Sequence, residues 1–127
     1  MCHNLNIARG LYMKEKKSYY DPCMYGTEHY YLHPIYGQSM KYTDSVKYFM
    51  ETKSAFWTLD VCASYWPKLK KEEFVTFIFD VTDGACEFRA ENGNGKVLVK
   101  QEIPYTDLDV NVKFFFTNNV LMFPSDY

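Results

Sequence analysis

The spacing of apolar residues changes along the chain, from a helical period in the first half to strict alternation in the second. After the capping sequence Thr43-Asp44-Ser45, apolar residues recur three and four positions apart, which predicts a helix that begins there. We expect Thr52 or Ser54 to cap a second helix running to about Tyr65, and Pro67 to end it. The apolar stripe of this second helix is broad, which is typical of a helix buried on more than one side.

Beyond residue 74, bulky apolar residues alternate with polar ones, which is the period of a half-buried β-strand. Short turn sequences separate the alternating segments: Asp83-Gly84, Asn92-Gly93-Asn94-Gly95 and Asn118-Asn119. Turns this short join neighbouring strands antiparallel. The sequence therefore predicts an α+β fold, an antiparallel meander of four to five strands with one or two helices packed on one face. We expect a single domain over 1–127, with a helical half at 1–71 and a sheet half at 72–127.

Composition and chain ends narrow the class of protein. The 127 residues are 47% hydrophobic and 24% charged, which is ordinary for a globular domain and excludes a disordered tail or a coiled coil. No signal peptide is visible, and no apolar run approaches the roughly 18 residues of a membrane helix. We therefore expect a cytoplasmic protein without membrane contact. Its four cysteines form no Cys-x-x-Cys pair, which indicates reduced thiols rather than a metal site, and we expect no cofactor.

Charge and aromatic residues divide the chain in the same way. Residues 1–71 carry ten Lys and Arg against six Asp and Glu, a balance of +4, whereas residues 72–127 carry four against ten, a balance of −6. Ten of the 12 Tyr precede residue 67, and eight of the 10 Phe follow it. A tyrosine ring tolerates a half-exposed position because its hydroxyl is polar, whereas phenylalanine favours burial. The first half is therefore the expected contact surface, and the second half the expected core.

Lysines interleaved with tyrosines are typical of surfaces that bind single-stranded nucleic acid, because ammonium groups hold phosphates and rings stack on bases. Tyrosine-rich patches are equally typical of protein interfaces, and lysine-rich connectors are often only solvated. The acidic half, with Glu87, Glu91, Glu102, Asp107 and Asp109, would also suit a basic protein groove that normally holds nucleic acid. The candidate binding residues are Lys16, Lys17, Tyr19, Tyr20, His29, Tyr30, Tyr31, Lys68, Lys70 and Lys71.

Few residues suggest catalysis or metal binding. His29 and His33 are four apart, but Pro34 disfavours a helix through them, so we expect structural roles and no metal site. Cys23 with His29 lacks a visible group that would activate the thiol. Asp60 is a carboxylate in an apolar helix, and burial there would require a partner such as a tyrosine hydroxyl, a histidine or a lysine.

Three blocks of sequence, in this order, resemble one family of small bacterial proteins. They are Gly26-Thr27-Glu28-His29-Tyr30-Tyr31, Tyr42-Thr43-Asp44-Ser45-Val46-Lys47-Tyr48, and Ala55-Phe56-Trp57 with Leu59-Asp60 and Ala63-Ser64-Tyr65. The strand at 74–81 resembles the family more loosely. The family is a domain of unknown function often carried on plasmids and phages. The chain departs from the pattern at Trp66, where a polar residue is expected.

The resemblance implies a function rather than a catalytic site. Small proteins of mobile elements often inhibit bacterial defence by binding, and anti-CRISPR proteins are examples. The resemblance thus implies a non-enzymatic inhibitor, most specifically an anti-CRISPR protein that binds an RNA-guided, RNA-targeting effector nuclease, its guide RNA, or both. Two alternatives stay open: a small nucleic-acid-binding module, and a small hydrolase that uses Glu28, His29 and Asp60.

Overall fold

The computed structural model describes residues 29–127 of the chain. Expectations placed on Lys16, Lys17, Tyr19, Tyr20, Cys23 and Glu28 lie outside the described residues. In chain order the elements are β1 (Tyr30–His33), β2 (Gly37–Thr43), α2 (Asp44–Thr52), α3 (Phe56–Ser64), α4 (Trp66–Leu69), β3 (Phe74–Thr82), β4 (Ala85–Asn92), β5 (Val97–Ile103), β6 (Val112–Thr117), β7 (Val120–Met122) and the 3₁₀ turn η2 (Pro124–Asp126).

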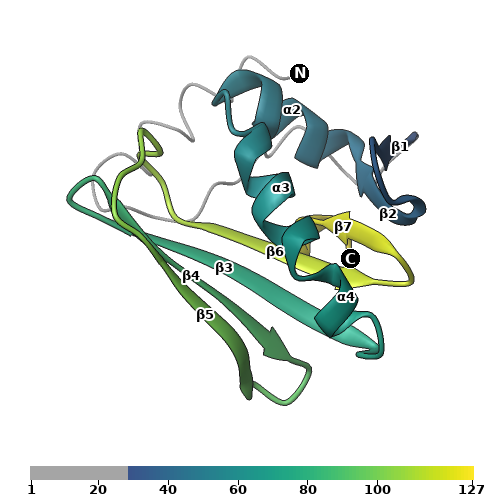
Figure 1. The fold of residues 1–127 in the computed structure, drawn as a ribbon. Coiled ribbons are helices and arrows are strands. Elements are labelled where there is room, and N and C mark those ends of the chain that lie inside the picture. Colours follow the sequence, from purple (N-terminus) through teal and green to yellow (C-terminus); the bar gives the residue numbers. More distant parts are fainter. Residues whose placement is uncertain (1–28) are drawn as a thin grey trace.

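All the described strands belong to one seven-stranded sheet, in the order β1-β2-β7-β6-β3-β4-β5 (Figure 1). Each neighbouring pair is antiparallel except β2 and β7, which run parallel. The class of mixed helices and strands was predicted correctly, but the meander of four to five antiparallel strands was not. The hairpin β1–β2 adds two strands, β6 pairs with β3 rather than with β5, and β7 lies between β2 and β6.

The sequence predicted the positions of α2 and α3 well, but it predicted only one of their two N-caps correctly. The Thr43 hydroxyl accepts a hydrogen bond from the Val46 amide, so the predicted cap of α2 is confirmed. The second helix begins at Phe56 without a side-chain cap, and its predicted capping by Thr52 or Ser54 is wrong. Pro67 does not end the helical region, because it lies in the first turn of α4, where its missing amide donor costs no hydrogen bond.

The predicted hairpin turns are present. Asp83 and Gly84 between β3 and β4 have φ of 51° and 78°, and Asn118 and Asn119 between β6 and β7 have 53° and 64°. Two successive residues with positive φ make the turn whose twist matches that of the flanking strands. Asn and Gly adopt this conformation at low cost, which is why these turn sequences are reliable local signals.

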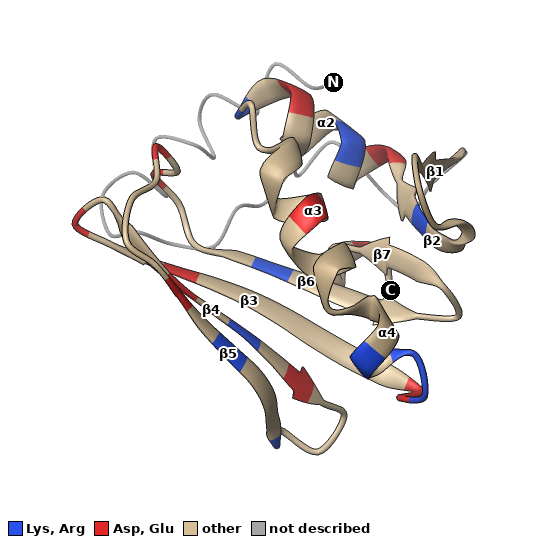
Figure 2. Cartoon of the chain, viewed as in Figure 1, with Lys and Arg blue, Asp and Glu red and all other residues tan. Residues whose placement is uncertain are grey.

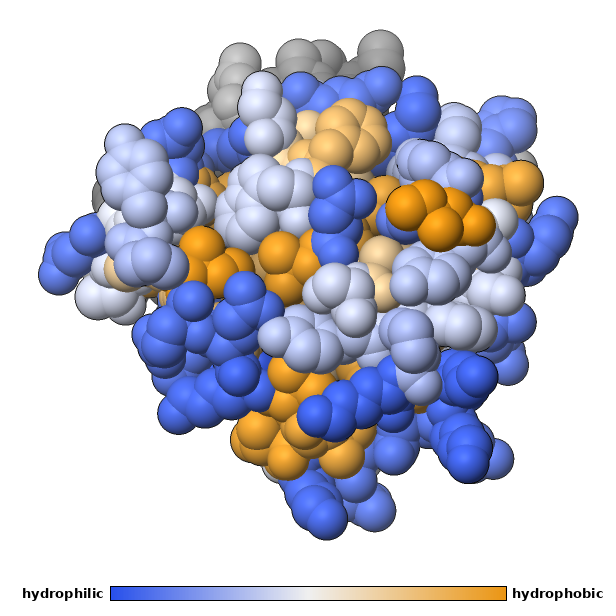
Figure 3. Space-filling view, viewed as in Figure 1, coloured by the Kyte–Doolittle hydropathy of each residue, from blue (hydrophilic) through white to orange (hydrophobic). Residues whose placement is uncertain are grey.

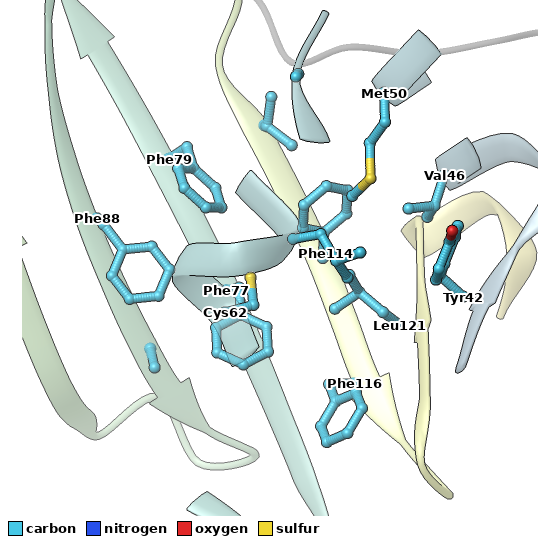
Figure 4. Close-up of a cluster of buried hydrophobic side chains, with 14 of the residues drawn as sticks. Tyr42, Val46, Met50, Cys62, Phe77, Phe79, Phe88, Phe114, Phe116 and Leu121 are labelled. Carbon is cyan, nitrogen blue, oxygen red and sulfur yellow. The ribbon is translucent and has the colours of Figure 1, made fainter. Parts of the chain in front are cut away.

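The core lies between the sheet and the helices, which cross one face of it (Figure 1). Phenylalanines of the central strands meet side chains of α2 and α3 there (Figure 4). The fully buried members include Val46, Phe49, Met50, Cys62, Phe77, Phe79, Phe88 and Phe114. The thiols Cys62 and Cys86 are core residues, and burial raises the pKa of Cys86 to about 11, which keeps it protonated at neutral pH.

Alternation along β6 predicts opposite consequences for two adjacent phenylalanines. Phe114 is fully buried, whereas Phe115 is half-buried on the other side of the sheet. We expect Phe114→Ala to lower the free energy of unfolding by about 3–5 kcal/mol, and Phe115→Ala by less than about half of that. Urea denaturation of the two variants measures both values. Equal losses would contradict the assignment of the two side chains to different faces.

Candidate binding surface

The hairpin β1–β2 presents apolar side chains to solvent at one edge of the sheet. Tyr30 and Leu32 alternate with inward-facing residues along β1, and Ile35 at the hairpin tip is 82% exposed. An exposed edge strand with bulky side chains is a ready site for pairing or docking with another molecule. Two of the sequence-predicted binding residues, Tyr30 and Tyr31, therefore lie on accessible structure.

Three lysine ammonium groups lie over aromatic rings in this part of the molecule. The Nζ atoms of Lys41 and Lys47 are 5.8 and 4.8 Å from the ring centres of Tyr30 and Tyr31. The Lys70 Nζ is 5.5 Å from the ring centre of Trp66. A cation over a ring face is attracted by the negative charge of the π-system. The sequence predicted that rings and lysines would gather, but three of these partners (Lys41, Lys47 and Trp66) were not among its candidates.

Tyr31 and His29 converge on one carboxylate at the start of α2. The Asp44 Oδ2 atom accepts a hydrogen bond from the His29 backbone amide, and Oδ1 lies 3.8 Å from the His29 Nδ1 atom. A hydrogen bond with Asp44 is the main cause that raises the pKa of Tyr31, so this phenol stays neutral. Lys47 is bonded to Glu51 one turn further along α2, which raises the pKa of its ammonium group. The cluster therefore offers a neutral phenol and a charged ammonium group side by side.

A row of aromatic rings in tilted contact joins the hairpin to α4. The ring centres of His33 and Tyr36 are 5.3 Å apart, and those of Tyr36 and Trp66 are 5.0 Å apart. His33 is buried, and its Nδ1 atom accepts hydrogen bonds from the backbone amides of Ile35 and Tyr36. These bonds fix the hairpin turn, so the position of the Tyr36 ring depends on a neutral His33 that carries its proton on Nε2.

Asp60 differs from its expected environment. Its side chain is 77% exposed, so the expectation of a buried carboxylate is wrong, because residue 60 lies on the outer side of α3. The expected histidine partner is nevertheless present: the Asp60 Oδ1 atom lies 3.8 Å from the His33 Nε2 atom. The proposed catalytic group does not form one cluster in the described chain, since His29 pairs with Asp44 and Asp60 with His33. No group of three or more His, Cys, Asp or Glu side chains in residues 29–127 is arranged to hold a metal ion.

The predicted lysines Lys68, Lys70 and Lys71 are exposed on α4 and the connector that follows it (Figure 2). Of the three, Lys70 lines a hollow of about 440 Å³, which is also lined by Trp66, Asn118 and Asn119 and by the carboxylates of Glu72 and Glu73. Seen from the helix side, hydrophobic patches alternate with hydrophilic side chains over this face (Figure 3). We call the group Tyr30, Tyr31, Ile35, Tyr36, Lys41, Lys47, Trp66 and Lys70 the aromatic–lysine surface; Tyr30 and Lys41 in this group lie on the side of the β1–β2 hairpin that faces away from the helices.

Residues 21–127 match DUF6876, a protein family of unknown function. The chain belongs to this family. The match spans every residue of the aromatic–lysine surface, and the sequence resemblance to a domain of unknown function is confirmed to that extent. This DUF6876 protein matches no curated protein and no solved structure. None of its helices within residues 29–127 has the length and apolar character needed to cross a membrane.

Burial of His33 predicts a pH-dependent stability. Desolvation lowers the pKa of His33 below its ordinary value of 6.5, although the nearby Asp60 opposes the shift. Just below pH 6.5 the unfolded chain therefore binds more protons at His33 than the folded chain does. The stability that the neutral His33 contributes is complete above that pH, and it is lost as the pH falls through the folded-state pKa. We expect the unfolding free energy of the wild type to fall between pH 8 and pH 5 relative to that of His33→Asn, whose amide oxygen still accepts hydrogen bonds.

Urea denaturation at the two pH values measures this difference. His29→Asn serves as a comparison variant that replaces an exposed imidazole, since the side chain of His29 is 73% exposed. Parallel pH profiles for the wild type and His33→Asn would contradict the role given to His33.

Proposed function

We propose that this protein acts by binding a macromolecular partner through the aromatic–lysine surface and that it catalyses no reaction. The observation that carries the proposal is the placement of three ammonium groups over three rings, on elements that the Tyr36–Trp66 contact holds together. A monomer gains little from such exposed pairs, since each contributes only about 0.5–1 kcal/mol. A partner that covers them removes water from rings and charges together, which strengthens both kinds of contact.

Both the rings and the lysines suit a partner that is rich in phosphate or acidic groups. Lysine is a mobile point charge that follows phosphates without reading sequence, and tyrosine or tryptophan offers a large rigid surface at small entropy cost. The hollow beside Trp66 adds the carboxamides of Asn118 and Asn119, which can both donate and accept hydrogen bonds. These features support recognition of a surface in which RNA and protein lie side by side.

The specific version of the proposal concerns a bacterial defence system. We propose that the partner is an RNA-guided, RNA-targeting effector nuclease, its guide RNA, or both, and that the protein is an anti-CRISPR inhibitor. The support is the resemblance in the sequence blocks around Tyr31, Lys47 and Asp60, together with the character of the aromatic–lysine surface. A small protein that blocks a guide-loaded nuclease needs only tight binding at equimolar concentration.

We predict that the protein co-elutes with a guide-loaded RNA-targeting effector and suppresses target cleavage at an equimolar ratio. Replacing Lys68, Lys70 and Lys71 together by Glu should weaken binding by at least about tenfold, which is 1.4 kcal/mol. Gel filtration and a cleavage assay measure the two effects. A matched single pair compares Lys70→Glu, which should weaken binding, with Lys96→Glu, which is also exposed but lies in the turn between β4 and β5 and should bind like the wild type.

Three outcomes would count against this version. Equal losses in Lys70→Glu and Lys96→Glu would show a general effect of net charge. Retention on single-stranded RNA at about 150 mM salt without the effector would instead favour a nucleic-acid-binding module, and each lost phosphate contact would then reduce the log–log salt slope by about 0.7–0.9. Substoichiometric turnover that His29→Ala abolishes would favour the hydrolase.

A further inference from the structure

The sheet face opposite the helices carries a cluster of three aromatic rings. Phe74 of β3, Phe115 of β6 and the final residue Tyr127 pack edge to face, with ring centres 5.0, 5.6 and 5.7 Å apart. None of the three belongs to the main core, and Tyr127 is 76% exposed. Within residues 29–127, no helix other than the short turn η2 adjoins this face (Figure 1). We call it the helix-free face.

The position of Tyr127 is fixed by the residue before it. The Asp126 Oδ2 atom accepts hydrogen bonds from the Thr43 hydroxyl at 2.9 Å, from the Ser45 hydroxyl, and from the Phe123 amide at 3.1 Å. The turn η2 is thereby tied to the start of α2. The exposed ring of Tyr127 is therefore held against Phe74 and Phe115 by a defined set of bonds.

Further along the same face, three carboxylates stand directly opposite one another on three adjacent strands. Asp80 of β3 pairs in register with Glu87 of β4, and Glu87 pairs with Glu102 of β5. They line a hollow of about 270 Å³ (acidic segments in Figure 2). Like charges in directly opposed positions destabilise a sheet. The arrangement therefore costs stability that the fold itself does not require.

The cations on this part of the face do not balance the carboxylates. Arg89 is shared among Asp80, Glu87 and Glu91 at 3.1–3.8 Å, and the Lys100 Nζ atom lies 3.3 Å from Glu87. With Lys113, which lies on the same face opposite Ile78 of β3, three cations serve four carboxylates, Glu102 included, which leaves a net charge of −1. Glu102 is exposed and has no described lysine or arginine within ion-pair distance.

We propose that the helix-free face is a second binding surface and that its occupant is a basic protein surface. Arginine or lysine side chains of the partner would pair with the carboxylates of Asp80, Glu87 and Glu102, and an apolar side chain would pack beside Tyr127. The two contact regions are six residues apart along β3, about 20 Å, which fits an interface burying about 800 Å² per partner. Nucleic acid does not suit this face, because its phosphates would meet carboxylates.

The test uses the full-length protein and a short soluble peptide in which arginine and leucine alternate. The isoleucine methyl groups report the site, because Ile78 lies on the helix-free face, Ile35 on the aromatic–lysine surface and Ile103 on the helix side. We expect the peptide to shift the NMR signal of the Ile78 methyl group saturably and to leave those of Ile35 and Ile103 unchanged. If the peptide does not shift the Ile78 signal, the proposed function is unaffected, because an effector that binds the aromatic–lysine surface would shift the NMR signal of the Ile35 methyl group.

Two matched pairs of variants sharpen the test. Glu102→Lys should weaken peptide binding by about tenfold. It should also raise the thermal midpoint of unfolding, because it places an ammonium group opposite Glu87. The control Asp107→Lys makes the same change of charge in an exposed loop and should bind the peptide like the wild type. Tyr127→Ala should lower the affinity, whereas Tyr105→Ala, which removes an equally exposed ring off this face (80% against 76%), should not.

Four results would overturn the proposal. These are no saturable binding, shifts confined to Ile35 or Ile103, equal effects within either pair of variants, and equal binding of a peptide with glutamate in place of arginine. Movement of the Ile78 signal on dilution of the protein alone would assign the face to a second copy of this chain, and movement on addition of single-stranded RNA would assign it to nucleic acid.

Discussion

The parallel pairing of β7 with β2 is the constraint on which both binding surfaces depend. It joins two parts of the chain that are about eighty residues apart, with the Lys41 amide bonded to the Asn119 carbonyl at 2.8 Å. Without it, the hairpin β1–β2 would be an isolated two-stranded unit, which is marginally stable in water. The bonds from Thr43 and Ser45 to Asp126 reinforce the same junction. The junction thus positions Lys41 beside Tyr30 and Tyr127 beside Phe115, on the same side of the sheet.

The aromatic residues of this chain have two different roles, and strand alternation decides which role each has. Phe114 and Phe116 face the helices and fill the core, while Phe115 between them faces away. Tyrosine hydroxyls allow rings to remain half-exposed on the hairpin, where lysines cover them. Lys47 over Tyr31 and Lys70 over Trp66 lie on the helix side of the sheet, whereas the strand register places Lys41 and Tyr30 on the same sheet face as Phe115.

The local parts of the fold could be predicted from the sequence, and the non-local parts could not. Positive-φ turns such as Asn118-Asn119 and the cap at Thr43 are decided by neighbouring residues. Strand β2 was missed because its apolar residues, Met40 and Tyr42, are few among polar ones. Its parallel partner β7 has only three residues, and pairing over so large a separation leaves no periodic signal. Asp60 was misplaced because the apolar stripe of α3 hides which side faces solvent.

The candidate surfaces follow the same division. The sequence predicted contact roles for Lys68, Lys70 and Lys71. It did not predict that the Trp66 ring accompanies Lys70, because this pairing depends on how α4 folds back on the hairpin. The pairs Lys41–Tyr30 and Asp80–Glu87–Glu102 depend on strand register, which one sequence does not encode locally. The place of Phe115, in contrast, follows from local alternation, which puts it on the opposite side of its strand from Phe114 and Phe116.

Arrangements that lower the stability of the fold distinguish functional surface from surface that is only in contact with water. Two of them stand out in this chain: three carboxylates in direct opposition, and large apolar side chains left in water on the hairpin. Each could be relieved by one ordinary substitution, such as glutamine at Glu102 or a polar residue at Ile35. Stability alone would favour these changes, because most proteins lie close to the threshold they need. Both features are what the proposed role, binding other macromolecules, would require.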